Sequence, residues 1–358
     1  MKILHVITSL SIGGAEHLLV DLLPRIKNYG IEVELAVFNS KRTSFYDQLE
    51  ESGIKIHGFS ETEGVYNLRH ILRLRKLMRK FDIVHTHNTA CQMFATLVKR
   101  RNNILVTTEH STSTRRRNYP FFRLIDRLMY SKYDKIICIS RPSEISLRHY
   151  IGNDYPIVTI LNGIDVNKFL NAPKIDLGFS QCKLITMVAG FRYEKDQATL
   201  VRALKHLPDI FHVLLVGDGE KRTEIESLIH QLNLTTRVHL LGIRNDVSSV
   251  LKSSDIIVMS SHREGLSLSN VEGMASGNPF VASDVEGLRE VTKGYGVLFP
   301  HGDEKYLADV ILKLDMDETY RTKVIDKCLE RARHYDINVM AQNYYKQYLQ
   351  LASNTNRI

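Results

Sequence analysis

The sequence has few cysteines and no long apolar run, and each absence excludes a class of protein. The four cysteines are dispersed and show no C-x-x-C spacing. This pattern argues against a disulfide-rich secreted scaffold and favours a reducing, cytoplasmic compartment. No apolar run reaches the length of about 18 residues that a membrane-spanning helix needs, so we expect no transmembrane segment.

The chain also lacks the features of a secretory leader. Its first ten residues, MKILHVITSL, form a short apolar run that contains His5 and continues into a glycine loop without a small-residue cleavage site. We therefore interpret this run as the first buried strand of a domain. We expect a cytoplasmic protein, either free or at the inner face of a membrane.

Positive charge is concentrated in the N-terminal half. Residues 1–168 hold 25 Lys and Arg against 16 Asp and Glu, whereas residues 169–358 hold 23 against 24. The excess fits a phosphorylated acceptor or an anionic membrane surface, and we assign the acceptor or membrane side to Arg115, Arg116 and Arg117. An ordinary solvated basic surface is the alternative. No nucleic-acid partner is expected, because the basic runs lack interleaved aromatic residues.

Strand and helix patterns alternate through both halves of the chain, which predicts an α/β protein with two parallel sheets. The basic amphipathic segment 66–81 is expected to be a core-packed helix, with a membrane-lying helix as the alternative. The predicted strands are 2–8, 31–38, 54–58, 82–86, 104–109, 134–139 and 157–161 in the first half, and 183–189, 211–216, 237–240, 255–260, 279–282 and 295–299 in the second.

The segment 260–279, SSHREGLSLSNVEGMASGNP, is the most informative part of the chain. Glu264 and Glu272 bracket a Gly- and Ser-rich turn that opens a predicted helix, which a strand at 280–283 follows. A helix N-terminus can hold a phosphate, and a carboxylate can bind sugar hydroxyls. The segment is therefore a candidate nucleotide-sugar site. A capping box from Ser269 to Glu272, which only starts the helix, is the alternative.

The same segment resembles the E-x7-E region of the retaining glycosyltransferases of family 4, which have the GT-B fold. Further likenesses follow in order along the chain: the first strand with its glycine loop, the Asn162-Gly-Ile-Asp165 segment and the Gly217-Asp-Gly219 turn. The resemblance implies two Rossmann-like domains that face each other across a cleft. It implies an acceptor domain at 1–168, a donor domain at 169–335 and a C-terminal helix, 336–358, that packs back on the first domain.

The resemblance also implies the residues of the donor site. Glu272 would hold the ribose, the backbone of Gly265, Leu266, Ser267, Leu268 and Ser269 would hold the phosphates, and Glu264 would contact the transferred sugar. Lys195 matches a family lysine that stabilises the departing diphosphate. The family arginine five positions earlier is replaced by Gly190, and we expect Arg192 to substitute for it. Glu290 lies at another strand-to-helix junction, where a plain surface glutamate is equally expected.

On the acceptor side, we single out the glycine loop and one histidine. Gly13 and Gly14 follow the first strand and allow the backbone to approach a ligand, although they could equally form only a tight turn. His110 follows the strand 104–109 and matches a family histidine beside the reacting sugar. His85 and His87 alternate on one strand, but no third ligand at suitable spacing accompanies them, so we expect no bound metal.

The resemblance implies hexosyl transfer (EC 2.4) with retention of anomeric configuration, from a nucleotide sugar to a lipid-linked, polysaccharide or glycolipid acceptor. We expect a UDP-sugar as the donor, because it is the commonest donor in the family. His110, Glu264 and Lys195 would be the catalytic groups, and no cofactor is required. Two alternatives stay open: a nucleotide-sugar 2-epimerase on the same fold, and a silent protein that only binds a nucleotide sugar. A nicotinamide dehydrogenase is poorly supported, because neither glycine turn completes G-x-G-x-x-G with a following acid.

Overall fold

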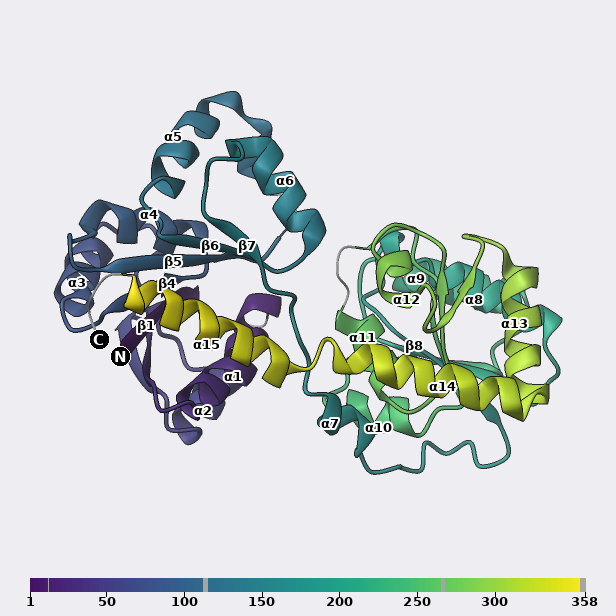
Figure 1. Cartoon of the computed structure of the whole chain (residues 1–358). Helices are drawn as coiled ribbons and strands as arrows, with labels where there is room; N and C mark the ends of the chain where they lie inside the picture. The colour runs from purple at the N-terminus through teal and green to yellow at the C-terminus, as the bar shows by residue number, and fades with distance from the viewer. Residues whose placement is uncertain (12, 112–114, 265–267, 355–358) are drawn as a thin grey trace. The chain divides into compact units, whose positions relative to one another are not determined.

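The computed structural model describes residues 1–11, 13–111, 115–264 and 268–354. The chain divides into two compact units, which we call unit 1 (Met1–Gly163 with Ile337–Ile358) and unit 2 (Ile164–Asp336). Both are parallel sheets covered by helices, as the sequence predicts (Figure 1). No helix in the described part of the chain is both long and apolar enough to cross a bilayer.

Unit 1 contains a seven-stranded sheet in the order β3-β2-β1-β4-β5-β6-β7, and every described strand pair in it is parallel. Its inner strands are nearly continuous runs of buried residues, because helices cover both faces of the sheet there, whereas the two edge strands are only partly buried. The strands are β1 (Lys2–Ser9), β2 (Glu32–Asn39), β3 (Lys55–Ser60), β4 (Ile83–Thr86), β5 (Ile104–Glu109), β6 (Lys135–Cys138) and β7 (Ile157–Thr159).

The helices of unit 1 bury one apolar stripe each against this sheet. Helix α3, for example, buries Leu74, Leu77 and Met78, as expected for a core-packed helix, while its basic residues Arg75 and Lys76 are exposed. The helices are α1 (Gly14–Lys27), α2 (Ser44–Glu51), α3 (Arg69–Met78), α4 (Thr89–Val98), α5 (Pro120–Tyr130), α6 (Arg141–Ile151) and α15 (Ile337–Ser353), with a short turn of 3-10 helix, η1 (Arg115–Asn118).

Unit 2 repeats this arrangement with six strands in the order β10-β9-β8-β11-β12-β13. Its strands are β8 (Lys183–Val188), β9 (Phe211–Val216), β10 (Val238–Gly242), β11 (Ile256–Met259), β12 (Phe280–Ser283) and β13 (Val297–Phe299). Its helices are α7 (Val166–Leu170), η2 (Tyr193–Lys195), α8 (Gln197–Ala203), η3 (Leu204–His206), α9 (Arg222–Gln231), α10 (Val247–Lys252), α11 (Leu268–Ala275), α12 (Leu288–Thr292), α13 (Glu304–Met316) and α14 (Glu318–Arg333).

The last helix, α15, belongs to unit 1 although it follows unit 2 in the chain. Its buried residues, among them Met340, Tyr344 and Tyr348, join the core formed by α1 and the first strands, and Figure 1 shows it in yellow beside α1. The units divide after Gly163 rather than after residue 168. The reason is that Ile164 forms a β-bridge with Asp336 and that α7 packs into the unit 2 core.

Strand order reverses between β1 and β4 in unit 1 and between β8 and β11 in unit 2. Open α/β sheets bind ligands at the carboxyl ends of the strands beside such a switch point. In unit 1 this edge carries His87 and His110, and in unit 2 it carries Lys195 and Glu264. The fold therefore brings predicted site residues to the switch point of each sheet.

Candidate functional site

In unit 2, the loop after β8 is held in place by a glycine turn after β9. A Cβ atom at Gly217 would lie 2.2 Å from the carbonyl oxygen of Ala189, and one at Gly219 would lie 2.5 Å from that of Phe191. Both glycines also have positive φ, so no other residue fits there without strain. The backbone NH of Phe191 donates to Asp218 O at 3.0 Å. The Gly217-Asp-Gly219 turn thus fixes the loop that carries Arg192 and Lys195.

Lys195 and Glu264 lie in direct contact. The Nζ atom of Lys195 donates to Oε1 of Glu264 at 2.5 Å, and the Ser261 hydroxyl donates to the same oxygen at 2.9 Å. The Glu264 side chain is only 9% exposed and that of Lys195 is 23% exposed. Two residues 69 positions apart are therefore brought together, and the ion pair is partly shielded from water. An anion that approached Lys195 would compete with Glu264 for it.

The position of Arg192 bears on the missing family arginine. Its Nε atom lies 3.9 Å from the point where a Cβ atom of residue 190 would stand, so the Arg192 side chain occupies space beside Gly190. Arg192 is exposed, and among the described residues its guanidinium makes no ion pair within 4.0 Å. This placement is compatible with the expected substitution.

Helix α11 begins at Leu268, directly after the part of the glycine turn that lies outside the described residues, Gly265, Leu266 and Ser267. Ser269 is the second residue of the helix rather than the residue before it, so it is not placed to form the alternative capping box. Glu272 is half-buried one turn further along. Asn270, which sequence reasoning missed, is fully buried, and neither of its amide atoms has a hydrogen-bond partner among the described residues.

Glu290 lies in the first turn of α12, and its side chain is exposed. Nothing in its surroundings distinguishes it from a surface glutamate.

In unit 1, a pocket of about 340 Å³ lies at the carboxyl ends of β4 and β5. His110 lines it, half-buried, together with His87, Asn88 and Glu109. Burial lowers the pKa of His110 to about 4, so the ring is neutral at physiological pH. The predicted histidine therefore lines a pocket, as an uncharged hydrogen-bonding group.

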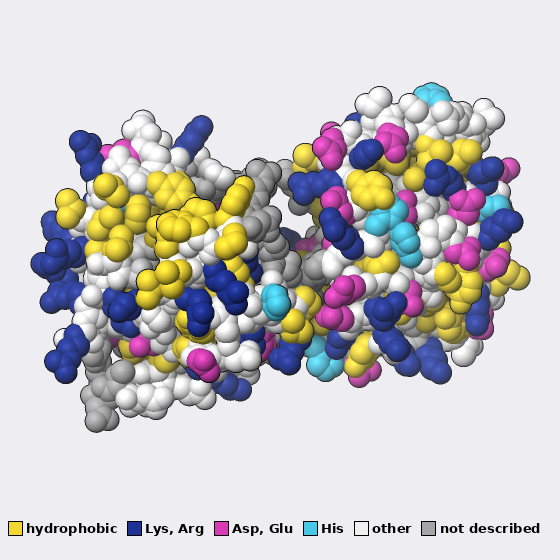
Figure 2. Space-filling view, turned by 90° about the horizontal axis from the view of Figure 1, so that it is seen from above, with side chains coloured by type: hydrophobic (Ala, Val, Ile, Leu, Met, Phe, Trp, Pro, Cys, Tyr) yellow, Lys and Arg dark blue, Asp and Glu magenta, His cyan; other side chains and the backbone are white. Residues whose placement is uncertain are grey.

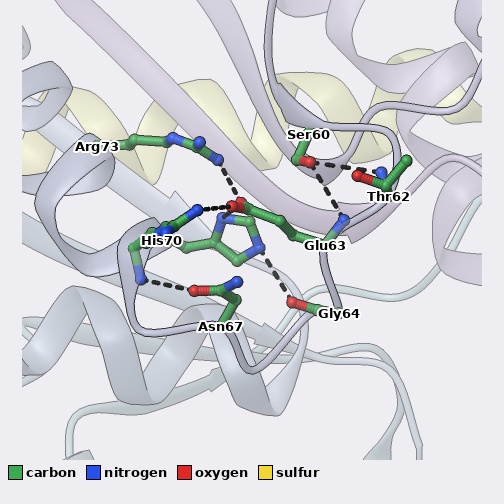
Figure 3. Close-up of polar contacts among 8 residues, drawn as sticks. Ser60, Thr62, Glu63, Gly64, Asn67, His70 and Arg73 are labelled. Carbon is green, nitrogen blue, oxygen red and sulfur yellow. Dashed lines mark hydrogen bonds and ion pairs between the residues drawn. The ribbon is translucent and has the colours of Figure 1, made fainter.

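The loop after β3 forms another wall of this pocket through Val65 and Tyr66. Figure 3 shows how it is anchored to α3: Arg73 donates to Glu63 at 2.6 Å, and a ring nitrogen of His70 lies 3.1 Å from the carbonyl oxygen of Gly64. Burial is the largest single influence on the pKa of Glu63 and raises it. Arg73 and Arg69, which hydrogen-bond to it, together outweigh burial and hold the pKa below its usual value. The polar face of α3 thereby fixes a pocket wall, a role that the sequence did not suggest.

Two of the three arginines assigned to an acceptor or membrane side are used inside unit 1 instead. Arg117 is 8% exposed and donates to Glu109 at 2.8 Å. Arg116 pairs with Asp126 and lies 4.8 Å from the ring centre of Phe122. Buried cations need such partners, because desolvation is costly. The expectation of a free basic cluster is thus wrong for these two residues, and the Arg115 side chain lies outside the described residues.

The glycine loop has a defined geometry at Gly13. This residue precedes α1 in an extended conformation, and a Cβ atom there would lie 2.3 Å from Oε2 of Glu16. A side chain at residue 13 would therefore displace the Glu16 carboxylate, which lies over the start of the helix. Gly14 is exposed, and no atom of the residues compared in the described part of the chain lies within 4 Å of its hypothetical Cβ, so a side chain there would meet open space.

The fold supplies the third histidine that the sequence reasoning did not find. His5 on β1 is in register with His85 on β4, and His87 points to the same side. Ligand atoms of these three rings lie within 4.8 Å of one another, as do those of Asp196, His262 and His301 in unit 2. The argument against a metal from missing ligands is therefore wrong. However, each ring nitrogen of the first set already has a hydrogen-bond partner.

Comparison with known proteins identifies relatives across both units. Residues 12–168 match the family model described as Glycosyltransferase Family 4, and residues 174–331 match the one described as Glycosyl transferases group 1. The phosphatidyl-myo-inositol mannosyltransferase of Mycolicibacterium smegmatis is 26% identical over 94% of this chain and 90% of its own length.

Two further relatives extend this comparison. The UDP-Gal:alpha-D-GlcNAc-diphosphoundecaprenol alpha-1,3-galactosyltransferase of Escherichia coli is 28% identical over 62% of this chain and 63% of its own length. Among solved structures, Anabaena Alr3699/HepE in complex with UDP and glucose superposes with a TM-score of 0.80 at 20% identity, covering 98% of this chain and 100% of that one.

Proposed function

The chain belongs to family 4 of the glycosyltransferases with the GT-B fold, and from this premise we propose that it transfers a sugar from a UDP-sugar to a hydroxyl group of a lipid-linked or glycolipid acceptor. The observation that carries this proposal is the shielded Lys195–Glu264 ion pair at the switch point of unit 2, directly before the segment that leads into α11. It joins a cation for phosphate to a carboxylate for sugar hydroxyls.

In this proposal, the donor binds at the switch point of unit 2. Lys195 and Arg192 hold the diphosphate, the backbone of Gly265, Leu266, Ser267, Leu268 and Ser269 offers it NH groups, and Glu272 binds the ribose. When the diphosphate engages Lys195, Glu264 is released to contact the transferred sugar. The UDP-Gal donor of the E. coli relative and the UDP bound in the Anabaena structure support uridine as the base.

For the chemistry, we propose transfer with retention of anomeric configuration. The departing diphosphate accepts the proton of the incoming hydroxyl on the face that it leaves. Lys195 and Arg192 stabilise the negative charge that develops on the leaving oxygen, which is where stabilisation accelerates the reaction most. Glu264 orients the sugar and supports positive charge at its anomeric carbon. His110 is neutral, so it acts as a hydrogen-bonding group on the acceptor side rather than as an acid.

The reaction as proposed needs no metal ion. The nitrogens of His5, His85 and His87 are occupied by hydrogen bonds within unit 1. In unit 2, Asp196 caps α8 by accepting from the backbone NH of Thr199, and His262 is bonded to His301. The cations Lys195 and Arg192 can neutralise the leaving group in place of a metal.

For the acceptor, we propose a lipid-linked molecule presented at an anionic membrane, which α5 of unit 1 contacts. Phe121, Leu124 and Leu128 are 75%, 67% and 61% exposed on this helix, and Arg123 and Arg127 are exposed beside them. The acid of this helix, Asp126, is buried. Figure 2, which views unit 1 from the side of α5 and α6, shows hydrophobic side chains gathered there with Lys and Arg at the margin. Such a face suits a lipid surface better than water.

The test is a transfer assay with purified protein, a panel of UDP-sugars, and acceptors that carry a sugar on undecaprenyl diphosphate or on phosphatidylinositol. We expect transfer to one acceptor without added metal and in the presence of a chelator, and NMR of the product should show the anomeric configuration of the donor. The proposal is overturned if folded Lys195→Ala and Glu272→Ala variants turn over donor as fast as the parent.

A further inference from the structure

A continuous chain of hydrogen bonds runs through the core of unit 1 from the C-terminal helix to the pocket. At the pocket, His110 Nε2 lies 3.0 Å from Nδ1 of His87, whose Nε2 lies 2.8 Å from Nδ1 of His5. Nε2 of His5 lies 3.4 Å from the hydroxyl of Tyr348 on α15. The three imidazoles and this tyrosine thus connect α15 to the pocket.

The chain continues on the other side of Tyr348. The Tyr348 hydroxyl lies 2.6 Å from Nδ1 of His85, and Nε2 of His85 lies 2.8 Å from Oγ1 of Thr108. Oγ1 of Thr108 lies 3.1 Å from the hydroxyl of Tyr344, which is one turn before Tyr348 on α15. Apart from His110, all members of the chain are at most 3% exposed. Water therefore cannot substitute for a missing partner along it.

The protonation states leave few arrangements of the protons. Burial holds the pKa of each histidine well below its usual value and that of each tyrosine above it, so all members are neutral. A neutral imidazole has one donor and one acceptor nitrogen, and a hydroxyl has one proton. A hydroxyl could also accept at both of its links, but its own buried proton would then have no acceptor within the chain. If every link is a hydrogen bond and the protons of Tyr348 and Thr108 are both paired within the chain, all of the links point the same way.

The direction is set at the end that lies on α15. If the bonds ran inward from His110, Tyr344 would accept from Thr108, and its own buried proton would have no acceptor in the described part of the chain. Leaving a buried donor unpaired disfavours that arrangement by about tenfold or more. If the bonds run outward, Tyr344 donates to Thr108, and each proton from Tyr344 to His87 has an acceptor within the chain. His110 then accepts from His87 and carries its own proton on Nδ1.

We propose that Tyr344 and Tyr348, acting through Thr108, His85, His5 and His87, hold His110 in the tautomer protonated on Nδ1, and so present a hydrogen-bond donor to the ligand of the unit 1 pocket. No described residue hydrogen-bonds to Nδ1 of His110, and His110 lines the pocket. The two tyrosines are positioning residues. Their part in catalysis rests on the proposed transferase function, whereas the tautomer itself does not.

This arrangement gives α15 a second role beside packing. Its apolar face joins the core of unit 1, while its two buried hydroxyls fix the orientation of protons at the pocket. A ligand with an oxygen lone pair, such as a sugar hydroxyl or a phosphate oxygen, would find a fixed donor there. A ligand that offers only a proton would not.

The test uses the full chain labelled with ¹⁵N histidine. Long-range ¹H–¹⁵N NMR spectra distinguish the two neutral tautomers, and we expect His110 of the parent protein to be protonated on Nδ1. In Tyr348→Phe, which breaks the chain at its centre, we expect a mixture of tautomers at His110. Tyr345→Phe is the matched control: Tyr345 also lies on α15 but stacks on Tyr29, outside the chain, and its loss should change nothing at His110.

Activity provides the second readout. Tyr348→Phe should lower kcat about tenfold with little change in the KM for donor, whereas Tyr345→Phe should match the parent. If the spectra are as expected but no transfer occurs with any donor, the transferase proposal fails and the tautomer assignment stands. A proton on Nε2 of His110 in the parent overturns the assignment without any variant. Stoichiometric zinc in the purified protein also overturns it, because a metal on His5, His85 and His87 would replace these hydrogen bonds.

Discussion

The two units have sheets with the same central strand order, yet the polar residues at their switch points differ in charge and in burial. In unit 1, the histidines beneath the pocket are neutral, buried and hydrogen-bonded to one another, as His5, His85 and His87 are, and Glu109 at the pocket is ion-paired with the buried Arg117. In unit 2, the polar groups of the candidate site are charged and lie on loops, as Lys195, Glu264 and Arg192 do. A neutral site can orient hydroxyl groups, whereas a charged one can hold a diphosphate. The contrast thus matches acceptor and donor roles.

The largest expected difference between the units is their response to acid. The four histidines of the hydrogen-bond chain in unit 1, His5, His85, His87 and His110, have lowered pKa values, about 3 for His5 and about 4 for His110, so the unfolded chain takes up protons first as the pH falls. Their contribution to the free energy of unfolding is complete above about pH 6.5. Below that pH it falls by about 1.4 kcal/mol for each histidine and each pH unit.

Hydrogen exchange measured at pH 7 and pH 5, and corrected for intrinsic rates, should therefore show β1 and β4 losing protection while β8 and β11 keep theirs. His85→Gln should flatten the response of unit 1. Equal losses in both units would contradict this account.

Lys195 should show the next largest effect. Lys195→Ala removes the cation that we propose faces the leaving group and also leaves the shielded Glu264 without this partner, so kcat should fall by about 10²–10³-fold. The matched control is Lys183→Ala, which breaks another ion pair of unit 2, with Asp315, away from the site. Steady-state kinetics of both variants test this, and similar losses in the two would show that the effect is only structural.

A smaller effect tests whether Arg192 replaces the family arginine. Arg192→Ala should lower kcat/KM about tenfold through the loss of a charge-assisted contact. Among the described residues, a Cβ atom at residue 190 would meet nothing closer than 3.6 Å, so the backbone there has room for the first atom of a side chain, and the second neighbour, Arg192, is shortened in Arg192→Ala. Adding Gly190→Arg to Arg192→Ala should restore most of the activity. Failure of this rescue, with the double variant folded, would count against the substitution.

The smallest expected effect concerns the surface of α5. Leu124→Ser combined with Leu128→Ser should weaken binding to vesicles of anionic lipid about tenfold, because shallow insertion of each leucine buries roughly the equivalent of one CH₂ group, about 0.8 kcal/mol. Ile243→Ser is the matched control, since Ile243 is 81% exposed but belongs to unit 2. Vesicle sedimentation decides between them, and a parent protein that does not sediment with anionic vesicles would remove the membrane from the proposal.

The fold was predictable from the sequence because its signals are local. All thirteen predicted strands are present, with small shifts at their ends, since buried strands of parallel sheets are continuous apolar runs. Lys195 and Glu264 were named separately, from turns that follow strands, and the sheet then brings them together. Their direct ion pair was not foreseen, because they are 69 residues apart in sequence.

The missed features depend on contacts over long sequence distances. His5 joins His85 and His87 only through the pairing of β1 with β4, and Tyr348 lies 343 residues from His5. In the sequence, Arg117 looks like a free surface cation. Its partner, Glu109, is the last residue of β5, and nothing in that strand's sequence indicates that this carboxylate needs a cation. A basic run in a loop has no periodicity that would reveal its buried partners.

The most direct test of the donor site is calorimetric titration of UDP into the parent protein and into Lys195→Ala. The account predicts that the parent binds one UDP per chain without added metal, more tightly than GDP or ADP, and that Lys195→Ala binds it at least about tenfold more weakly. Equal affinity in the two proteins, or no nucleotide binding by the folded parent, would contradict the assignment of the donor site to unit 2.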